Sequence, residues 1–573
     1  MKNADIAQIF NNIADLLEIK NENPFRIRAY RRAALNIAEL GKDVSSLSAE
    51  ELQEIPGIGR DLAAKIGEYL KTGRVEAYEK LKQEVPETLI ELLAIPGLGP
   101  RTVSLLYAKF DIKDVGSLEK LAREHKLSGL PGIKDKTEAG IIKGIELVRR
   151  HSARHPLGKI LPLANQLRGY LAETAPVEKL EIAGSIRRWK ETIRDIDIIS
   201  TSGDPDAVMK VFTRMPGVSQ VLAKGPTKSS VLLEDGIQVD IRVVEADSFG
   251  AALAYFTGSK AHNIRLREIA SKAGLKINEY GIFREKDNRK LGGREEEDIY
   301  KVLGLQFVPP ELREDMGEVE AAAEEKLPSL LEPADMKGDL HVHSNWSDGT
   351  QDLEGLVKTS AEKGYRYIAV TDHSKGLGVA RGLSEERILE QKKMIDAINR
   401  KTGRVRILTG AEINIKSDGS LDFDDELLRQ LDVVIASIHS GFRQSSEQIT
   451  KRIIAAMKNP NVSIIGHPTG RLLGEREAYE VDMEKVLQTA AGTGTAIEIN
   501  AYPLRLDLSE ANVRRARELK VPVVISTDAH NSAQFDNMRY GVAVARRGWL
   551  EKKDVLNTFE SARVLKKLKN KRI

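Results

Sequence analysis

The stretch GDLHVHSNWSDG (Gly338–Gly349) places two histidines on either side of one valine, and an aspartate follows five residues after the second histidine. The chain has only ten histidines among its 573 residues. Residues two apart in a strand share a face, so His341 and His343 can reach one cluster while Val342 packs the other way. This spacing predicts a strand that carries metal ligands, although it does not identify a function by itself.

The histidines of the last third of the chain share one position in the sequence pattern. Six of the ten lie after residue 335, and each follows or ends a β-rich run. These runs alternate with helical patterns, which predicts parallel βα units whose strand ends meet at one face of a barrel. With three carboxylates in comparable positions, the candidate ligands are His341, His343, Asp348, His373, Glu412, His439, His467, Asp528 and His530.

The number of these ligands bears on the chemistry. Nine nitrogen and oxygen ligands exceed what one ion takes, so two or three Mn²⁺, Zn²⁺ or Fe²⁺ ions are expected. Such a centre supports metal-assisted hydrolysis of a phosphoester. The alternative, hydrogen-bonded core histidines, fits poorly with six histidines that all occur at strand ends.

The length and composition of the chain limit its number of domains, its kinds of metal site and its compartment. A chain of 573 residues is expected to form several domains. The absence of cysteine excludes disulfides and thiolate metal sites. With no signal peptide and no apolar run of about 18 residues, the cytoplasm is the expected compartment and no membrane is expected as a partner. The net charge of +3 does not decide for or against nucleic acid.

The first part of the chain reads as helical and contains a repeated motif. IPGIGRDLAAKI (Ile55–Ile66) recurs as IPGLGPRTVSLL (Ile95–Leu106), and a degenerate copy occupies Leu130–Ile142. A glycine turn followed by a helix N-terminus presents N–H groups to an anion, which on DNA is a backbone phosphate. We therefore expect DNA contacts at Gly57, Gly59, Gly97 and Gly99. A purely structural hairpin is the alternative, and the degenerate copy is expected to be mostly structural.

The middle of the chain carries a pair of carboxylates in GSIRRWKETIRDIDIIS (Gly184–Ser200). Asp195 and Asp197 would share one face of a strand, and Asp240 lies in another strand, IQVDIRVV. Carboxylates grouped in this way suit Mg²⁺ and could form a two-metal site for phosphoryl transfer. The alternative is two solvent-facing acids on an edge strand.

Residues 1 to about 318 resemble a family X DNA polymerase. The matching segments are the two glycine hairpins, GSIRRW, RDIDI, KGPTKSS, QVDIRVV and YFTGSKAHNIRLR (Tyr255–Arg267). The resemblance implies a metal-binding catalytic triad of Asp195, Asp197 and Asp240 with two Mg²⁺ or Mn²⁺. It also implies the following contacts: Gly184, Ser185 and Arg188 with the incoming triphosphate; Tyr255, Phe256 and Gly258 with the sugar; Asn263 and Arg267 with the nascent pair and template; Lys224 and Lys228 with the DNA backbone.

Two positions depart from the better-known eukaryotic members of that family. Gln238 stands where those members have an arginine, so contacts with the primer end are expected to differ. Lys65 matches the family's Schiff-base lysine, but Asp61 replaces a lysine in the surrounding pocket. A lyase activity at Lys65 is therefore a hypothesis, and a phosphate-facing or solvated lysine is the alternative.

Residues of about 336–573 resemble a PHP (polymerase and histidinol phosphatase) domain, and all nine ligand positions are filled. The resemblance implies a distorted (β/α)₇ barrel with a trinuclear centre. A family X polymerase followed by a PHP domain resembles the bacterial and archaeal polymerases of this family. It implies a 3′–5′ exonuclease, with abasic-site or 3′-end processing as a further activity.

The expected protein is multidomain. Its expected parts are an all-α helix–hairpin–helix domain (1–84), fingers with a second helix–hairpin–helix (85–150), an α/β nucleotidyltransferase palm (151–247), a thumb (248–317), a helical linker (318–335) and the PHP barrel (336–573). The expected function is gap-filling synthesis with dNTPs on gapped or primer–template DNA by a monomer. The alternatives are a polymerase fused to a small-molecule phosphatase and a DNA-binding repair scaffold.

Overall fold

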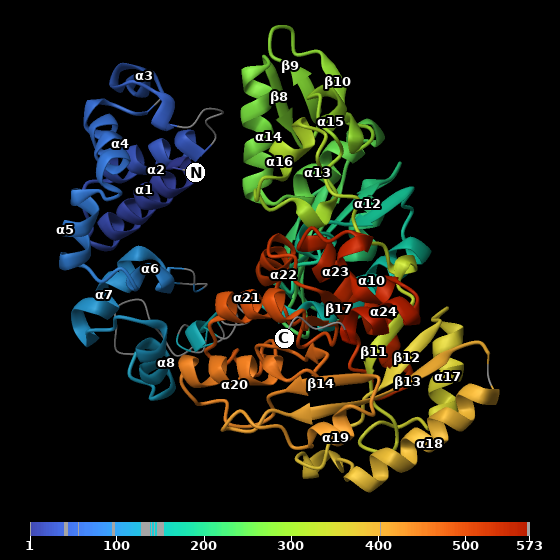
Figure 1. Cartoon of the computed structure of the whole chain (residues 1–573). Coiled ribbons are helices and arrows are strands. Elements are labelled where there is room, and N and C mark those ends of the chain that lie inside the picture. The colour runs from blue at the N-terminus through green and yellow to red at the C-terminus, as the bar shows by residue number, and fades with distance from the viewer. Residues whose placement is uncertain are drawn as a thin grey trace. The chain divides into compact units, whose positions relative to one another are not determined.

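The computed structural model describes residues 2–38, 44–55, 57–93, 95, 98–127, 138, 140–142, 144–145, 154–401 and 403–569. The chain divides into two compact units. Unit 1 contains residues 1–153, 174–181 and 194–303, and unit 2 contains residues 154–173, 182–193 and 304–573. Figure 1 shows the helical N-terminal part in blue and the strands of the C-terminal part in yellow to red.

The N-terminal part of unit 1 is helical, as the periodicity predicts. The first helix, α1 (Lys2–Ile19), buries Phe10, Ile13 and Leu16 along one side. Residues three and four apart share a helix face, which explains why these apolar side chains enter one core. The remaining helices of this part are α2 (Pro24–Ala38), α3 (Ala49–Glu54), α4 (Arg60–Thr72), α5 (Glu76–Glu84), α6 (Leu89–Leu92), α7 (Pro100–Phe110) and α8 (Val115–Arg123).

A five-stranded sheet follows, with the strand order β2-β4-β7-β6-β5. Its strands are β2 (Lys179–Ile182), β4 (Asp195–Thr201), β5 (Val218–Lys224), β6 (Lys228–Leu233) and β7 (Gln238–Val243). Helix α12 (Pro205–Phe212) connects β4 to β5. β4 runs parallel to β7, whereas β6 is antiparallel to both of its neighbours. β7 alternates half-buried and buried residues along its whole length, and β4 does so over Asp195–Ile198 before it becomes fully buried.

The rest of unit 1 is a small α/β region that begins with α13 at Phe249. Its three-stranded antiparallel sheet has the order β10-β9-β8. Its elements are α13 (Phe249–Thr257), α14 (Lys260–Lys272), β8 (Leu275–Asn278), β9 (Gly281–Arg284), β10 (Lys290–Gly292) and α15 (Glu297–Val302).

Unit 2 contains a seven-stranded parallel sheet whose strands follow one another in chain order. They are β11 (Gly338–Val342), β12 (Tyr367–Val370), β13 (Arg406–Asn414), β14 (Val433–Ser437), β15 (Ile464–Ile465), β16 (Ala496–Asn500) and β17 (Val523–Ser526). A parallel bridge between Val342 and Ala529 joins the two ends of the sheet. The predicted distorted (β/α)₇ barrel is therefore confirmed.

Helices connect and flank the barrel strands. They are α17 (Leu353–Glu362), α18 (Glu385–Lys401), α19 (Asp425–Leu428), α20 (Ser446–Lys458), α21 (Met483–Thr493), α22 (Glu510–Glu518), α23 (Met538–Arg547) and α24 (Ser561–Lys569). The earlier parts of unit 2 are the two-residue strands β1 (His155–Pro156) and β3 (Thr192–Ile193), α10 (Leu157–Thr174) and α11 (Gly184–Arg187).

The barrel interior explains where the ligands lie. One buried apolar cluster takes side chains from every barrel strand, including Ala369, Leu408 and Val524. Side chains alternate between the two faces of a strand, so positions an even number of residues further along share the same face. Continuing from these three core residues by four places leads to His373, Glu412 and Asp528. Glu412 thus extends the interior face of β13, and His373 and Asp528 follow the carboxyl ends of β12 and β17.

The predicted helical linker is largely wrong. Helix α16 covers only Glu318–Ala323. Beyond it the chain is extended around Leu330, which bridges to Glu551, and it ends in a 3₁₀ turn at Pro333–Asp335. Glu325 adopts a left-handed conformation with a φ of 57°, and this ends the helix well before Pro328 despite its alanine-rich composition.

Candidate metal centre and nucleic-acid interface

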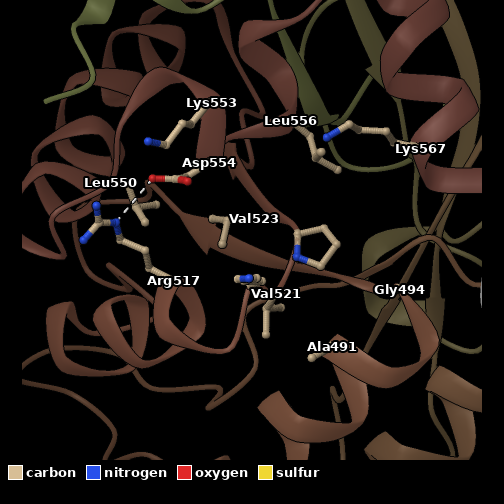
Figure 2. Close-up of a pocket in the computed structure, with 12 residues that line it drawn as sticks. Ala491, Gly494, Arg517, Val521, Val523, Leu550, Lys553, Asp554, Leu556 and Lys567 are labelled. Atoms are coloured by element: carbon tan, nitrogen blue, oxygen red, sulfur yellow. Dashed lines mark ion pairs between the residues drawn. The ribbon is translucent and has the colours of Figure 1, made fainter. Parts of the chain in front are cut away.

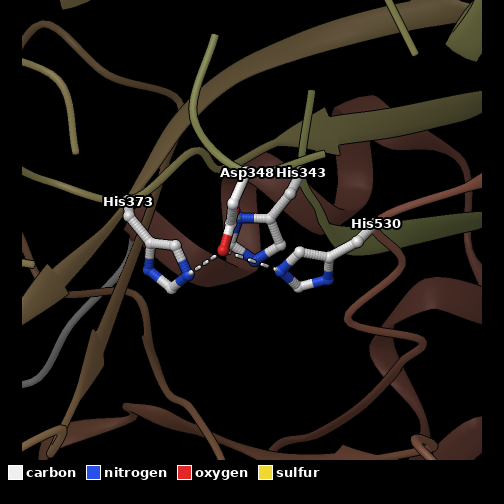
Figure 3. A group of neighbouring side chains, drawn as sticks. All are labelled: His343, Asp348, His373 and His530. Atoms are coloured by element: carbon white, nitrogen blue, oxygen red, sulfur yellow. Dashed lines mark ion pairs between the residues drawn. The ribbon is translucent and has the colours of Figure 1, made fainter. Parts of the chain in front are cut away.

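The nine predicted ligands converge at the carboxyl-terminal face of the barrel. Eight of them form three overlapping groups, in each of which one ligand atom per residue lies within 4.8 Å of the others. The groups are His343, Asp348, His373 and His530; His341, His343 and Asp528; and His373, Glu412 and His439. Figure 3 shows the first group, in which the carboxylate of Asp348 points between the rings of His373 and His530.

Glu412 is the central carboxylate of the cluster. Its Oε1 lies 3.0 Å from Nε2 of His467 and 3.2 Å from Nε2 of His439. Its Oε2 lies 2.8 Å from Nδ1 of His373 and 3.5 Å from Nε2 of His341. The side chain is buried, and it connects the ninth ligand, His467, to the other eight.

A second layer of polar groups orients the ligands. Glu498 is fully buried and lies 2.7 Å from Nδ1 of His341 through Oε1, while its Oε2 accepts from the backbone N–H of His467 at 2.7 Å. Nδ1 of His439 lies 2.6 Å from Oδ1 of Asn414. A partner on one ring nitrogen fixes the ring and directs the other nitrogen to an ion. The sequence analysis missed both residues, although each occupies a polar position in a buried strand.

The electrostatics of the cluster keep its carboxylates ionised and divide its histidines. Burial, together with the neighbouring His373 and His530, lowers the pKa of His343 to about 3, so this ring is neutral. Burial would also lower the pKa of His341, but Glu498 and the other nearby carboxylates raise it well above its usual value. Burial alone would raise the pKa of Glu412, but His439 and other histidines hold this pKa well below its usual value. Neutral imidazoles and ionised carboxylates are the forms that bind divalent ions.

Buried ring nitrogens without hydrogen-bond partners also support the binding of metal ions. Nε2 of His341 and Nδ1 of His343 are buried and have no hydrogen-bond partner within the described chain. Buried polar atoms are normally satisfied, so unpaired ring nitrogens that face carboxylates indicate an additional binding partner. The donor set of imidazoles and carboxylates suits Mn²⁺, Zn²⁺ or Fe²⁺.

A cationic side chain borders the centre. Nε of Arg505 lies 3.7 Å from Oδ2 of Asp528. Its Nη1 is buried and, in the part of the chain that the structure describes, makes no hydrogen bond. Arg505 follows β16 in a loop, and sequence reasoning missed it because no motif or spacing marked it.

The three aspartates of the middle section lie on neighbouring strands of unit 1. The register of β4 and β7 pairs Asp197 with Asp240 and Asp195 with Gln238. Asp195 and Asp197 are both half-buried, while Ile196 between them is buried. The structure thus brings the predicted residues side by side on one face of the sheet.

These aspartates contact protein donors. Nε2 of Gln238 donates to both carboxylate oxygens of Asp240, at 3.0 and 3.2 Å, and the Ser230 hydroxyl also donates to Asp240. Arg194 donates to Asp195 at 3.1 Å. Among the described residues, the groups whose ligand atoms meet within 4.8 Å are all in the barrel, so the palm carboxylates are less tightly gathered.

The predicted nucleotide contacts fall in two places. Gly184 has a φ of 63° and begins α11 in unit 2, which Arg188 caps. In unit 1, the rings of Tyr255 and Phe256 meet edge to face with centroids 5.1 Å apart.

The rest of the YFTGSKAHNIRLR motif is held by hydrogen bonds. Gly258 ends α13 with a φ of 68°. Nδ2 of Asn263 donates to the carbonyl of Tyr255 at 2.6 Å, and Nε of Arg267 donates to the carbonyl of Asn263 at 3.4 Å. These bonds fix the side chains at the junction of α13 and α14.

The described residues of the two glycine hairpins share the same helix start. Gly59 and Gly99 are extended residues at the start of α4 and α7, and neither helix has a side-chain cap. The first N–H groups of a helix have no partner inside it, so they can bind an anion. Gly57 has a φ of 84°, which glycine adopts readily. Gly97 and most of the third copy lie outside the described residues.

The remaining candidates are lysines. Lys65 is 15% exposed at its side chain and lies 2.5 Å from Asp61. Lys224 and Lys228 are exposed at the ends of the adjacent strands β5 and β6, where a DNA backbone could approach them. None of the described helices is both long and apolar enough to cross a membrane.

A cavity of about 400 Å³ lies at the opposite end of the barrel strands. Its lining includes Val523, the first residue of β17, whereas Asp528 and His530 follow the last residue of that strand. Figure 2 shows Arg517 pointing toward Asp554 in this cavity, at 3.5 Å. The cavity is therefore separate from the metal centre.

Four families match successive parts of the chain. A helix-hairpin-helix domain matches residues 1–75, and a SAM-like helix-hairpin-helix tandem matches residues 89–146. The DNA polymerase beta thumb matches residues 252–314, and the PHP domain matches residues 339–502.

Curated relatives match over different lengths. A probable phosphatase of Thermoanaerobacter sp. (strain X514) is 34% identical over 231 residues, which are 38% of this chain and 89% of the relative. A probable phosphatase of Syntrophotalea carbinolica is 35% identical over 202 residues, 34% of this chain and 79% of the relative. The protein named DNA polymerase/3′-5′ exonuclease PolX of Bacillus subtilis (strain 168) is 40% identical over 560 residues, 97% of each chain. The chain therefore belongs to the PolX-type family X DNA polymerases with a C-terminal PHP domain.

Proposed function

We propose that this protein is a DNA polymerase with its own 3′–5′ exonuclease, and that it fills short gaps in DNA. The convergence of nine ligand side chains at one end of the barrel carries the nuclease assignment. The full-length similarity to a protein named DNA polymerase/3′-5′ exonuclease supports the pairing of the two activities.

The palm is the proposed site of nucleotide addition. Asp195, Asp197 and Asp240 would hold two Mg²⁺ or Mn²⁺ ions, supported by the register of β4 and β7. Bound there, such ions would stabilise the charges that develop in phosphoryl transfer.

The groups around the incoming nucleotide are proposed from the motif and its local geometry. Gly184, Ser185 and Arg188 would bind the triphosphate, for which the guanidinium is suited by its planar fork of donors. Tyr255, Phe256 and Gly258 would lie beside the sugar. Asn263 and Arg267 would lie beside the nascent pair and the template, in positions that their hydrogen bonds maintain.

The barrel is the proposed site of 3′-end trimming. Its nine ligands would hold two or three Mn²⁺, Zn²⁺ or Fe²⁺ ions, which when bound activate water and neutralise a phosphate. Glu498 and Asn414 keep the rings of His341 and His439 in place. The unpaired Nη1 of Arg505 would donate to a phosphate oxygen of the substrate.

DNA would be held by the hairpins and the exposed lysines. The uncapped N-termini after Gly59 and Gly99, with the turn at Gly57 and the matching position Gly97, would contact backbone phosphates. Lys224 and Lys228 would add charge that does not depend on sequence.

One assay tests both assignments. A 5′-labelled gapped duplex is incubated with Mn²⁺, with and without dNTPs, and the products are separated by length. The variant Asp195→Ala/Asp197→Ala is expected to lose extension and keep trimming. His341→Ala/His343→Ala is expected to do the reverse. If both variants keep both activities, the site assignments are wrong.

The barrel's similarity to probable phosphatases supports a second candidate function, hydrolysis of small phosphomonoesters. Under this alternative the barrel releases inorganic phosphate from a phosphomonoester, and the labelled primer is not shortened. Trimming that disappears in His341→Ala/His343→Ala would exclude it as the sole activity of the barrel.

A further inference from the structure

Residues 182–193 belong to the same compact unit as the barrel, although the polymerase motif GSIRRW lies within them. This segment contains Gly184–Arg187, the four-residue helix α11, and then Trp189 with a φ of 54°. Such a short helix bounded by left-handed residues has few hydrogen bonds of its own. Its conformation must therefore depend on the groups packed against it.

Arg547, the last residue of the barrel helix α23, contacts this segment directly. Its side chain is only 2% exposed. Its Nη1 donates to the backbone carbonyl of Arg188 at 2.5 Å, and its Nε and Nη2 donate to the two carboxylate oxygens of Glu510 at 2.9 and 2.6 Å. Both Nη atoms also lie 3.3 Å from Oε1 of Glu314.

The same two carboxylates hold the side chains of the segment. Nε of Arg188 donates to Oε1 of Glu314 at 3.0 Å. Nζ of Lys190 donates to Oε1 of Glu510 at 2.9 Å. Arg547 thus stands between Glu314 and Glu510, which bind Arg188 and Lys190, respectively; Nζ of Lys190 also lies 3.9 Å from Oε1 of Glu314.

Two further contacts attach this segment to the barrel. Nη2 of Arg471 lies 2.7 Å from Oε2 of Glu191. The ring of Trp189 meets that of Tyr540, on α23, edge to face at 5.9 Å. The segment is therefore held along its length, but Arg547 alone among these residues binds the Arg188 backbone and both carboxylates.

We propose that Arg547 is a positioning residue for polymerisation: from the barrel, it orients Arg188 to bind the incoming triphosphate. The inference rests on the triphosphate role proposed above for Arg188. A guanidinium is planar, so a bond through Nε to Glu314 sets the direction of the whole group. Errors of about 1 Å in a positioned group can reduce catalysis about a hundredfold.

The consequence is a dependence of nucleotide binding on the nuclease barrel. Without Arg547, the carbonyl of Arg188 loses its donor and the two carboxylates lose a shared cation. A buried partner left unsatisfied is destabilised, and a short segment with few hydrogen bonds of its own can reorganise in response. Arg188 would then sample orientations that do not bind phosphate.

The test compares Arg547→Met with Arg546→Met in the full-length protein. Methionine keeps an apolar side chain and removes every donor. Arg546 is a matched control, because it is the neighbouring arginine, its side chain is 15% exposed, and its bonds go to Glu311, Glu332 and the carbonyl of Leu331. The KM for dNTP in gap filling is expected to rise roughly tenfold in Arg547→Met. It is expected to stay within about twofold of wild type in Arg546→Met.

A general loss of structure would also change other measured properties, so these properties serve as controls. The KM for DNA and the rate of 3′ trimming should both remain close to wild type in Arg547→Met. An unchanged KM for dNTP, or an equal rise in Arg546→Met, would overturn the inference. If Arg547→Met does not fold, Arg547→Lys and Glu314→Gln replace it, with an intermediate rise expected for lysine, which keeps the charge and loses the fork. An unchanged KM in both replacements would also overturn it.

A double-mutant cycle separates this inference from the proposed function. Arg188→Ala should raise the KM for dNTP by itself; if it does not, the triphosphate role of Arg188 is wrong. If it does and Arg547→Met has no effect, only the positioning role fails. Because Arg547 is proposed to act through Arg188, Arg547→Met should add less than about twofold in the Arg188→Ala background.

Discussion

The palm and the barrel both gather carboxylates suited to ions, but they arrange them differently. In the barrel, Glu412 is buried and contacts several histidines within 3.5 Å. In the palm, the Asp195 side chain is 27% exposed, and the carboxylates meet protein donors such as Gln238 and Arg194. The barrel centre is a buried cluster of histidines and carboxylates from many strands. The palm site is a row of aspartates on neighbouring strands of one sheet.

This difference follows from how the negative charge of the carboxylates is neutralised at each site. Imidazoles surround the barrel carboxylates, so a compact cluster forms without excessive repulsion between like charges. Mg²⁺ keeps part of its water shell and is usually bound through one or two carboxylates together with substrate phosphates. We therefore expect the barrel to retain ions between reactions and the palm to take them up with the nucleotide.

The largest expected effect is on the rate of 3′ trimming by the barrel. Glu412→Gln replaces the central carboxylate by a neutral amide of nearly the same shape. Trimming should fall about a thousandfold, because several kcal/mol of charge stabilisation are lost with the ions. Trimming and extension are measured on the same labelled gapped duplex, and extension should be unchanged. Near-normal trimming would mean that Glu412 does not hold the ions.

A substitution at Glu498, which contacts a ligand and is not itself a ligand, should have a smaller effect on the metal centre of the barrel. Glu498→Gln weakens the support of His341 and is expected to reduce metal affinity about 10- to 100-fold. Metal content after dialysis against graded chelator measures this affinity. In wild type, complete removal of metal should also lower the melting temperature, because ions that bind only the folded state stabilise it. Equal metal retention in wild type and Glu498→Gln would count against the supporting role.

A smaller change is expected in the palm. Gln238→Ala removes a donor that competes with an ion for both oxygens of Asp240. The Mg²⁺ concentration for half-maximal extension should fall about two- to threefold, as expected for loss of one hydrogen bond of modest net strength. A titration of extension against Mg²⁺ measures this, with trimming as the internal control. A rise instead would mean that Gln238 supports the ion site.

The smallest effect is expected at Lys65. Its ion pair with Asp61 occupies the amine that a Schiff base would require. Borohydride trapping on DNA with an abasic site should therefore give no more adduct than Lys65→Ala gives. An adduct that disappears in Lys65→Ala would establish the lyase activity and reverse this expectation.

Much of this protein could be predicted without coordinates. His341 and His343 share a strand face because side chains alternate, and the other seven ligands follow from their places at strand ends. The pairing of Asp195 with Asp197 follows from the same rule. The helical linker was overestimated, because the alanine-rich composition does not reveal the left-handed turn at Glu325 that ends α16.

Other features depended on the tertiary structure. Glu498 and Asn414 support ligands that come from different strands, so only the order of strands in the barrel reveals them. Arg505 and Arg547 act across loops and helices whose packing no local pattern encodes. The sequence by itself determined which residues could bind ions, because ligand chemistry and strand periodicity are local. Only the tertiary structure decided which buried groups orient them, because those contacts join segments that lie far apart in the chain.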